Sequence, residues 1–174
     1  MQGRNIVYII GFMGSGKTTA GKKVSDRLGW DFIDLDEKIA NIERKPVSMI
    51  FTESGEQYFR DMESHVLRNL DIKNDTVISV GGGAPCSPGN MDYMKANGLV
   101  VYLQKTPEQL LSRLSGDAGK RPLLKGLKGD NLLTYITDKL AEREDFYNKA
   151  DLLITGIETD ISELSDKITE SVKR

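Results

Sequence analysis

The sequence predicts an α/β fold in which a parallel sheet lies between two layers of helices. Short β-branched runs alternate along the chain with longer helical patterns, and this alternation is typical of parallel strands joined by crossover helices. Two of the runs, 6–10 and 99–103, are almost entirely apolar, as strands buried on both faces must be. The runs expected to form strands are residues 6–10, 32–35, 76–80, 99–103 and 152–155.

Helical patterns fill the segments between these runs. Ligands of such sheets gather at the carboxyl ends of the strands, so clustered polar residues are expected there. The helices are expected at about residues 17–28, 37–70, 88–97, 107–114, 131–147 and 161–172.

Length and composition indicate a single globular domain spanning residues 1–174. The chain has 24 basic and 26 acidic residues, and its net charge of −2 indicates neither a nucleic-acid partner nor a membrane partner. An anionic ligand must therefore be held by a local group of basic side chains. The single cysteine, Cys86, suits a reducing compartment, and no apolar run is long enough for a signal peptide or a membrane span. We therefore expect a cytoplasmic protein.

A phosphate-binding loop follows the first predicted strand. Residues 11–18 read GFMGSGKT and fit the pattern G-x-x-x-x-G-K-[ST] between a strand and a helix. The glycines let backbone N–H groups turn toward phosphate oxygens, and the first N–H groups of the following helix face the same anion. Lys17 can then reach the β- and γ-phosphates, and the Thr18 hydroxyl can bind Mg²⁺. The loop predicts nucleoside triphosphate binding, but it does not distinguish a kinase from a switch or a motor.

Two carboxylates end the second predicted strand. Period-two alternation places Asp34 and Asp36 on the same side of this strand, beside the phosphate loop. Such carboxylates can hold Mg²⁺ through water or accept a proton from a substrate hydroxyl. Because Asp36 directly precedes a helical pattern, it can also be the N-cap of that helix.

Two arginines lie on or beside apolar helical stripes. Arg143 lies at the centre of such a stripe in the helix predicted at 131–147, and Arg60 flanks a stripe that contains Glu63. An inward guanidinium needs an anionic partner, which for Arg143 is either a protein carboxylate or a bound anion. Glu63 can orient Arg60, whereas Glu56 competes to form an ordinary surface pair with it. Because arginine grips a carboxylate at two points, the two arginines suggest an anionic second substrate.

Two glycine-rich segments complete the candidate site. Residues 115–129 combine four glycines and four basic residues with little helical periodicity, which indicates either a lid over an anion or a solvated surface loop. Residues 81–83 are three glycines after the third predicted strand. They either bring the backbone close to a ligand or form an ordinary turn.

Taken in order, these motifs resemble the shikimate kinase family over residues 5–168. The resemblance implies a five-stranded parallel sheet of order 2-3-1-4-5, with substrate-binding helices at about 36–62 and a lid at about 115–129. It also implies a monomer that uses MgATP to phosphorylate the 3-hydroxyl of shikimate, a step of chorismate and aromatic amino acid biosynthesis. The matching stretches are GFMGSGKT at 11–18, FIDLD at 32–36, FRDME at 59–63, GGGA at 81–84, RPLL at 121–124 and ER at 142–143 with Tyr147 following.

The resemblance also implies a shikimate site and a catalytic group. Arg60 and Arg143 would hold the shikimate carboxylate, and Asp36 and Gly82 would hold the ring hydroxyls. Asp36 would be the candidate base. The catalytic residues implied by the resemblance are Asp36, Lys17 and Arg121.

For the nucleotide, the resemblance implies a set of residues around the phosphate loop. Arg121 would close over the transferring phosphate, and Arg113 would stack on adenine. Thr18 would bind Mg²⁺, and Asp34 would join it through water. The loop at 156–158 lacks the proline that the family often has near the adenine. The residues expected to bind ATP are Gly14, Ser15, Gly16, Lys17, Thr18, Thr19, Arg113 and Arg121.

Two other functions fit part of the sequence. Another small-molecule kinase on this scaffold, such as a gluconate kinase, would share the anionic acceptor, whereas a nucleotide kinase would need base-recognition elements that the sequence does not display. A non-catalytic nucleotide-binding module or switch would need neither the two inward arginines nor a basic lid. Testing ATP consumption against a panel of hydroxy acids separates these possibilities.

Overall fold

A single parallel sheet forms the centre of the computed structural model, which describes residues 4–116 and 121–172. Its strand order is β2-β3-β1-β4-β5, and all four neighbouring pairs are parallel. This confirms the α/β fold class and the strand order expected from the sequence. The strands are β1 (Ile6–Ile10), β2 (Asp31–Asp34), β3 (Thr76–Ser79), β4 (Leu99–Leu103) and β5 (Leu152–Ile154).

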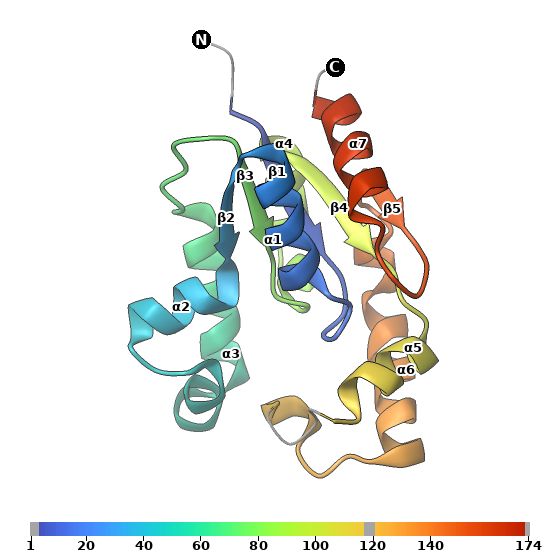
Figure 1. Cartoon of the computed structure of the whole chain (residues 1–174). Helices are drawn as coiled ribbons and strands as arrows, with labels where there is room; N and C mark the ends of the chain where they lie inside the picture. Colours follow the sequence, from blue (N-terminus) through green and yellow to red (C-terminus); the bar gives the residue numbers. More distant parts are fainter. Residues whose placement is uncertain (1–3, 117–120, 173–174) are drawn as a thin grey trace.

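Helices cover both faces of the sheet (Figure 1). Helices α1 and α7 pack together on the face nearest the viewer, and α3, α4 and α6 pack on the opposite face. Within the described residues no helix is both long enough and apolar enough to cross a membrane. The helices are α1 (Lys17–Leu28), α2 (Leu35–Glu43), α3 (Val47–Arg68), α4 (Asn90–Asn97), α5 (Pro107–Leu114), α6 (Gly129–Tyr147) and α7 (Ile161–Val172), with the 3₁₀ turns η1 (Ala84–Cys86) and η3 (Pro122–Leu124).

The apolar runs of the central strands supply two separate cores. In β1, Val7 and Ile9 pack against α1 and α7, whereas Tyr8 and Ile10 pack into the core on the other face. Strand β4 alternates in the same way. A third cluster joins Phe12 of the phosphate loop to apolar residues of α5, η3 and α6. The phosphate loop is therefore held by packing on one side as well as by the sheet.

The prediction of a single helix at residues 37–70 is wrong, because the chain changes direction twice within this segment. Helix α2 ends before Arg44, which has a left-handed backbone (φ 54°), and Pro46 is the N-cap of α3. Proline has no N–H to donate and disfavours a helical residue before it, so the helix cannot pass through Pro46. Gly55 then kinks α3, with φ at 85°. The helix expected at 88–97 also starts later, at Asn90.

Candidate active site

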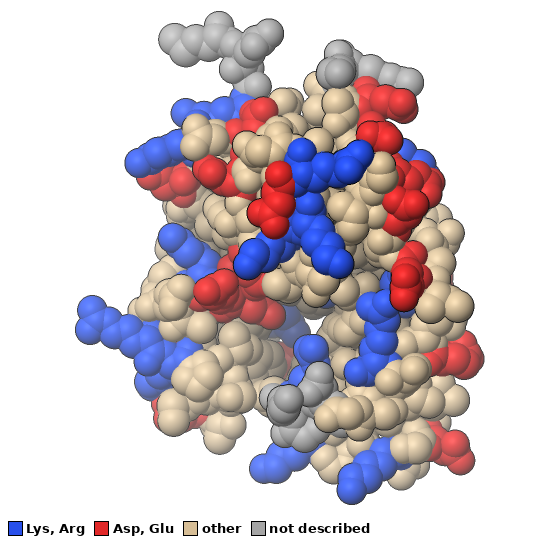
Figure 2. All heavy atoms as spheres, in the orientation of Figure 1, with Lys and Arg blue, Asp and Glu red and all other residues tan. Residues whose placement is uncertain are grey.

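Two cavities adjoin at the carboxyl edge of the sheet. Their volumes are about 360 and 270 Å³, and Asp36 and Arg121 line both of them, as do Met13, Gly81 and Gly82. The space-filling view shows a hollow beside the phosphate loop with basic side chains at its edge, while acidic and basic side chains are interspersed over the rest of that face (Figure 2). The shared residues mean that a group in one cavity can reach a group in the other.

The larger cavity gathers most of the residues expected to bind ATP. Ser15 is the exception: it is buried and lines a third cavity of about 270 Å³ together with Gly16, Thr19 and Arg113. Arg113 is exposed and donates a 2.9 Å hydrogen bond to the Ile157 carbonyl. The expected ATP residues that line the larger cavity are Gly14, Gly16, Lys17, Thr18, Thr19, Arg113 and Arg121.

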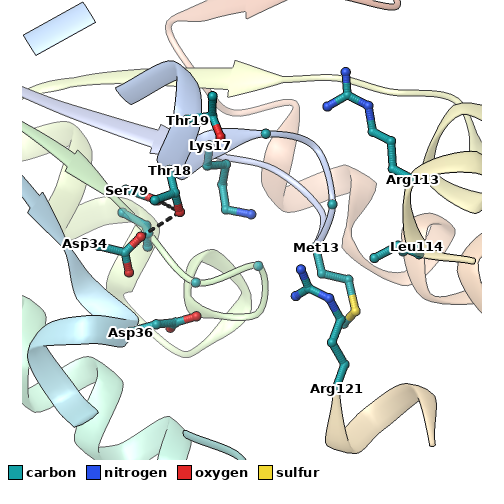
Figure 3. Close-up of a pocket in the computed structure, with 15 residues that line it drawn as sticks. Met13, Lys17, Thr18, Thr19, Asp34, Asp36, Ser79, Arg113, Leu114 and Arg121 are labelled. Carbon is teal, nitrogen blue, oxygen red and sulfur yellow. Dashed lines mark hydrogen bonds between the residues drawn. The ribbon is translucent and has the colours of Figure 1, made fainter. Parts of the chain in front are cut away.

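Three charged side chains converge at the middle of this cavity (Figure 3). The Lys17 ammonium donates to the Phe12 carbonyl at 3.0 Å, and burial lowers the Lys17 pKa to about 8. Burial also raises the pKa of Asp36, and the nearby Asp34 carboxylate raises it further. The Arg121 side chain points toward the same space. Two cations and one carboxylate therefore surround a space in which an anion would find charge partners.

Asp34 and Asp36 come together by a different route from the one expected. Strand β2 ends at Asp34, and Asp36 lies in the first turn of α2, so period-two alternation does not apply. Asp34 is the N-cap of α2 and accepts a 3.2 Å hydrogen bond from the Glu37 N–H. The capping role considered for Asp36 therefore belongs to Asp34. This leaves Asp36 free to face the cavity, where its Oδ1 has no hydrogen-bond partner among the described residues.

Hard oxygen donors lie at the foot of the phosphate loop. The Thr18 hydroxyl donates to Asp34 Oδ2 at 2.6 Å, and the Ser79 hydroxyl lies 3.4 Å from Thr18 Oγ1. Hydroxyl and carboxylate oxygens are the donors that Mg²⁺ prefers, and it commonly completes its coordination with water and substrate phosphates. The donor set therefore fits Mg²⁺ held jointly with a nucleotide.

The smaller cavity contains both of the inward arginines. Arg143 is 9% exposed, and its guanidinium lies 5.4 Å from the centre of the Phe12 ring. Among the described residues no carboxylate forms an ion pair with Arg143. Arg60 pairs with both Glu63, at 2.8 Å, and Glu56, at 3.2 Å. The cavity thus presents two guanidiniums, one of them without a described protein carboxylate.

The glycine triplet is pressed between the phosphate loop and α6. A Cβ on Gly82 would lie 3.2 Å from both the Gly11 carbonyl oxygen and the Met13 nitrogen. The Tyr147 hydroxyl donates a 2.5 Å hydrogen bond to the Gly82 carbonyl. A side chain at position 82 would therefore crowd the main chain of the phosphate loop, and the sequence did not reveal that Tyr147 anchors this glycine. The triplet is more than an ordinary turn, because it forms a wall of both cavities.

Glu63 is a fully buried carboxylate behind this wall. Its Oε2 accepts the hydrogen bond from Arg60, while Oε1 has no described partner and lies where a Cβ on Gly81 would collide with it. Burial is the main cause that raises the Glu63 pKa to about 7, and Asp36 adds to it while Arg60 opposes it. Glu63 therefore orients Arg60, but its ionised form is a buried negative charge without contact to water.

Glu63→Gln is expected to remove a pH dependence of stability. A folded-state pKa near 7 above an ordinary value near 4.5 means that the wild-type chain loses stability as pH rises from about 4.5 through 7. The loss is up to about 3 kcal/mol at ~1.4 kcal/mol per pKa unit. Urea unfolding at pH 4.5, 6 and 8 measures it, with Glu56→Gln as the exposed control on the same arginine. Curves for wild type and Glu63→Gln that stay parallel across this range would contradict the expectation.

The sequence did not reveal the apolar wall of the smaller cavity. Pro46, Val47 and Phe51 line it from the start of α3. The Phe51 and Phe59 rings lie 4.7 Å apart, and the Arg60 guanidinium lies within 6.0 Å of both ring centres. Pro46 is the sequence feature that could have indicated this wall. A helix that begins after Pro46 has its first turn at the smaller cavity, which residues 81–83 also line.

The shikimate kinase family model matches residues 13–173. The chain belongs to the shikimate kinase family. The shikimate kinase of Parabacteroides distasonis is 40% identical over 166 residues, which cover 93% of this chain and 96% of that protein.

Solved shikimate kinases share the fold over almost the whole chain. The Bacteroides thetaiotaomicron enzyme has a TM-score of 0.88 at 35% identity, covering 98% of this chain and 99% of that one. The Acinetobacter baumannii enzyme, solved in complex with shikimate, has a TM-score of 0.86 at 31% identity, covering 99% and 94%. A gluconokinase from Sinorhizobium meliloti reaches a TM-score of 0.58 at 16% identity, a likeness of fold alone. The gluconate alternative is therefore not favoured.

Proposed function

We propose that the chain transfers the γ-phosphoryl group of ATP to the 3-hydroxyl of shikimate, giving shikimate 3-phosphate and ADP in aromatic amino acid biosynthesis. The observation that carries the proposal is the junction of the two cavities at Asp36, Gly82 and Arg121. One cavity is built on a phosphate loop and the other on two arginines. The shikimate bound to the Acinetobacter baumannii relative supports the identity of the acceptor.

In the proposed reaction the shikimate 3-hydroxyl oxygen forms a bond to the γ-phosphorus, and the bond from that phosphorus to the bridging oxygen of ADP breaks. Asp36 accepts or orients the hydroxyl proton. Lys17 and Arg121 neutralise charge on the phosphoryl oxygens as it develops. Positioning and charge neutralisation dominate phosphoryl transfer, so little covalent help from the protein is needed.

The proposed metal is Mg²⁺, bound by Thr18 and, through water, by Asp34. When bound it supplies positive charge beside the phosphates. The Ser79 hydroxyl, whose oxygen lies 3.4 Å from Thr18 Oγ1, is a further oxygen donor at that position. The remaining ATP contacts in the proposal come from Gly14, Ser15, Gly16, Lys17, Thr19, Arg113 and Arg121.

The proposed acceptor is held by a carboxylate clamp of Arg60 and Arg143, with Asp36 and Gly82 at the ring hydroxyls. We also propose that the segment at about 36–62 carries the substrate-binding helices and that about 115–129 is the lid. Arg121, which lines both cavities, supports the lid; residues 117–120 of that segment lie outside the described part of the chain. The proposed enzyme is a cytoplasmic monomer. We propose no nucleic-acid or membrane partner, and the net charge of −2 supports this.

Arg143→Ala is expected to raise the KM for shikimate by about 10- to 100-fold, the scale of lost charged hydrogen bonds, with a smaller change in kcat. Steady-state kinetics at saturating ATP measure it, and Lys139→Ala on the same helix is the control. A neutral amide of shikimate sharpens the test: relative to shikimate it should lose less affinity with Arg143→Ala than with wild type, because only Arg60 of the clamp remains in the variant. An unchanged shikimate KM would reject the clamp.

A panel assay tests the function itself. ADP release is followed with shikimate, gluconate and a nucleoside monophosphate as acceptors, and the phosphorylated product is identified by ³¹P NMR. Turnover that depends on shikimate supports the proposal. Turnover with gluconate alone, or ATP binding with no acceptor turned over, would assign the chain to one of the two alternative classes.

A further inference from the structure

A buried lysine follows the carboxyl end of β4. Lys105 is 4% exposed, and its ammonium donates to the Gly156 carbonyl at 2.5 Å and to the Ile157 carbonyl at 3.2 Å. Among the described residues it forms no ion pair with a carboxylate. A buried ammonium needs strong partners, and here the partners are two main-chain carbonyls of the loop that follows β5.

The loop that Lys105 holds forms part of the third cavity. Glu158 and Thr159, the next two residues of that loop, line this cavity together with Ser15 and Gly16 of the phosphate loop. The segment between β5 and α7 has no regular structure of its own, and the Ile157 side chain is 71% exposed. Residues 155–158 are exposed, so side-chain packing does little to fix this segment. Its position therefore depends on the groups that bind its main-chain carbonyls.

Arg113 binds the same loop from the cavity side. Its Nη2 donates to the Ile157 carbonyl, which also accepts from Lys105, and its Nη1 lies 3.1 Å from the place where a Cβ on Gly16 would stand. Arg113 is exposed and lines both this cavity and the larger one that contains Lys17 and Arg121, and its side chain lies apart from theirs (Figure 3). A nucleotide in this cavity would compete with the Ile157 carbonyl for that guanidinium.

We propose that Lys105 is a positioning residue of the nucleotide site, which keeps the 156–159 loop beside the phosphate loop when Arg113 turns from the Ile157 carbonyl to the nucleotide. The proposal rests on the proposed function in one respect, that the third cavity receives part of the ATP molecule. Lys105 does not line that cavity, so it acts through the loop and not by contact with the ligand.

Lys105→Met tests this role, because it keeps the length of the side chain and removes its donors. We expect ADP to bind about tenfold more weakly by calorimetry, as for the loss of a charged hydrogen bond, with the KM for ATP rising in parallel. The KM for shikimate at saturating ATP should stay within about twofold. Lys105→Arg, which keeps the charge and the donors, should restore most of the ADP affinity.

Lys95→Met is the control for removing a lysine that holds the chain near β5. Lys95 also donates to a main-chain carbonyl near β5, that of Lys149 at 2.7 Å, but it lies at the amino ends of β4 and β5 and pairs with Asp151 at 2.5 Å. ADP affinity lowered in a folded Lys105→Met but unchanged in Lys95→Met supports the proposal. Unchanged ADP affinity in a folded Lys105→Met would overturn it.

A replacement variant covers the case of misfolding, and ADP binding separates failure of the inference from failure of the proposed function. If Lys105→Met does not fold, Lys105→Gln, which keeps an N–H donor of shorter reach, takes its place with the same expected weakening and the same contradicting result. ADP binding needs no phosphoryl transfer. Wild type that binds ADP but does not phosphorylate shikimate would therefore reject the proposed function and leave the Lys105 inference standing. Wild type that phosphorylates shikimate, together with unchanged ADP affinity in Lys105→Met, would reject only the inference.

Discussion

Asp36→Asn is expected to lower kcat by about 10²-fold or more, the scale of lost general-base catalysis, while the chain stays folded. Asp36 is the carboxylate at the junction of the two cavities, and its Oδ1 has no described hydrogen-bond partner. Burial raises its pKa, which strengthens it as a proton acceptor. The amide of asparagine fills the same space but cannot take a proton, so binding of ATP and shikimate should change much less than turnover.

A matched control is available on the preceding strand. Asp31 is exposed at the start of β2 and accepts a hydrogen bond from Asn74 at 2.9 Å, away from both cavities. Asp31→Asn removes the same charge and should leave kcat within about twofold of wild type, as for surface changes in general. Turnover of Asp36→Asn near that of Asp31→Asn would rule Asp36 out as the base. A pH–rate profile adds a second readout, because the acidic limb that reports a base should disappear in the variant.

The parts of the fold that depend on local patterns could be predicted. Strands β1 and β4 each supply two cores, so both of their faces are apolar and the sequence shows them as continuous apolar runs. The start of α1 was predictable because this helix begins at the end of the phosphate loop motif. The apolar periodicity of residues 37–70 continues across Pro46 although the proline separates two helices, so periodicity alone predicts a single helix there. The error at Asp36 came from extending strand geometry by two residues into a helix.

The parts of the site that depend on distant contacts could not be predicted. Tyr147 donates to Gly82 across 65 residues, and Lys105 donates to Gly156 across 51. Each of these bonds ends on a main-chain carbonyl, which every residue type offers, so the sequence carries no signal for the acceptor. Arg143 was predictable for the opposite reason: a guanidinium on an apolar stripe is an anomaly that local patterning exposes.

Lys17→Met is expected to lower kcat by about 10²- to 10³-fold, the scale of losing one group that stabilises charge in the transition state, and to weaken ATP binding as well. Among the described residues its ammonium hydrogen-bonds only to the Phe12 carbonyl, and burial lowers its pKa to about 8. A cation held in this way is poorly compensated until phosphate oxygens reach it. Methionine keeps the length of the side chain and its packing against the loop, so the loss reports the charge.

Lys22→Met, on the exposed face of the same helix α1, supplies the control and should leave kcat and the KM for ATP unchanged.

The comparison of Lys17→Met with Asp36→Asn then separates the two proposed contributions. Loss of Lys17 should raise the KM for ATP together with the fall in kcat, because the ammonium contacts phosphate before and during transfer. Loss of Asp36 should lower kcat with little change in the KM for ATP, because its partner is the acceptor. A Lys17→Met variant that retains turnover within about fivefold of wild type would place the neutralising charge on Arg121 instead, since that guanidinium lines the same cavity.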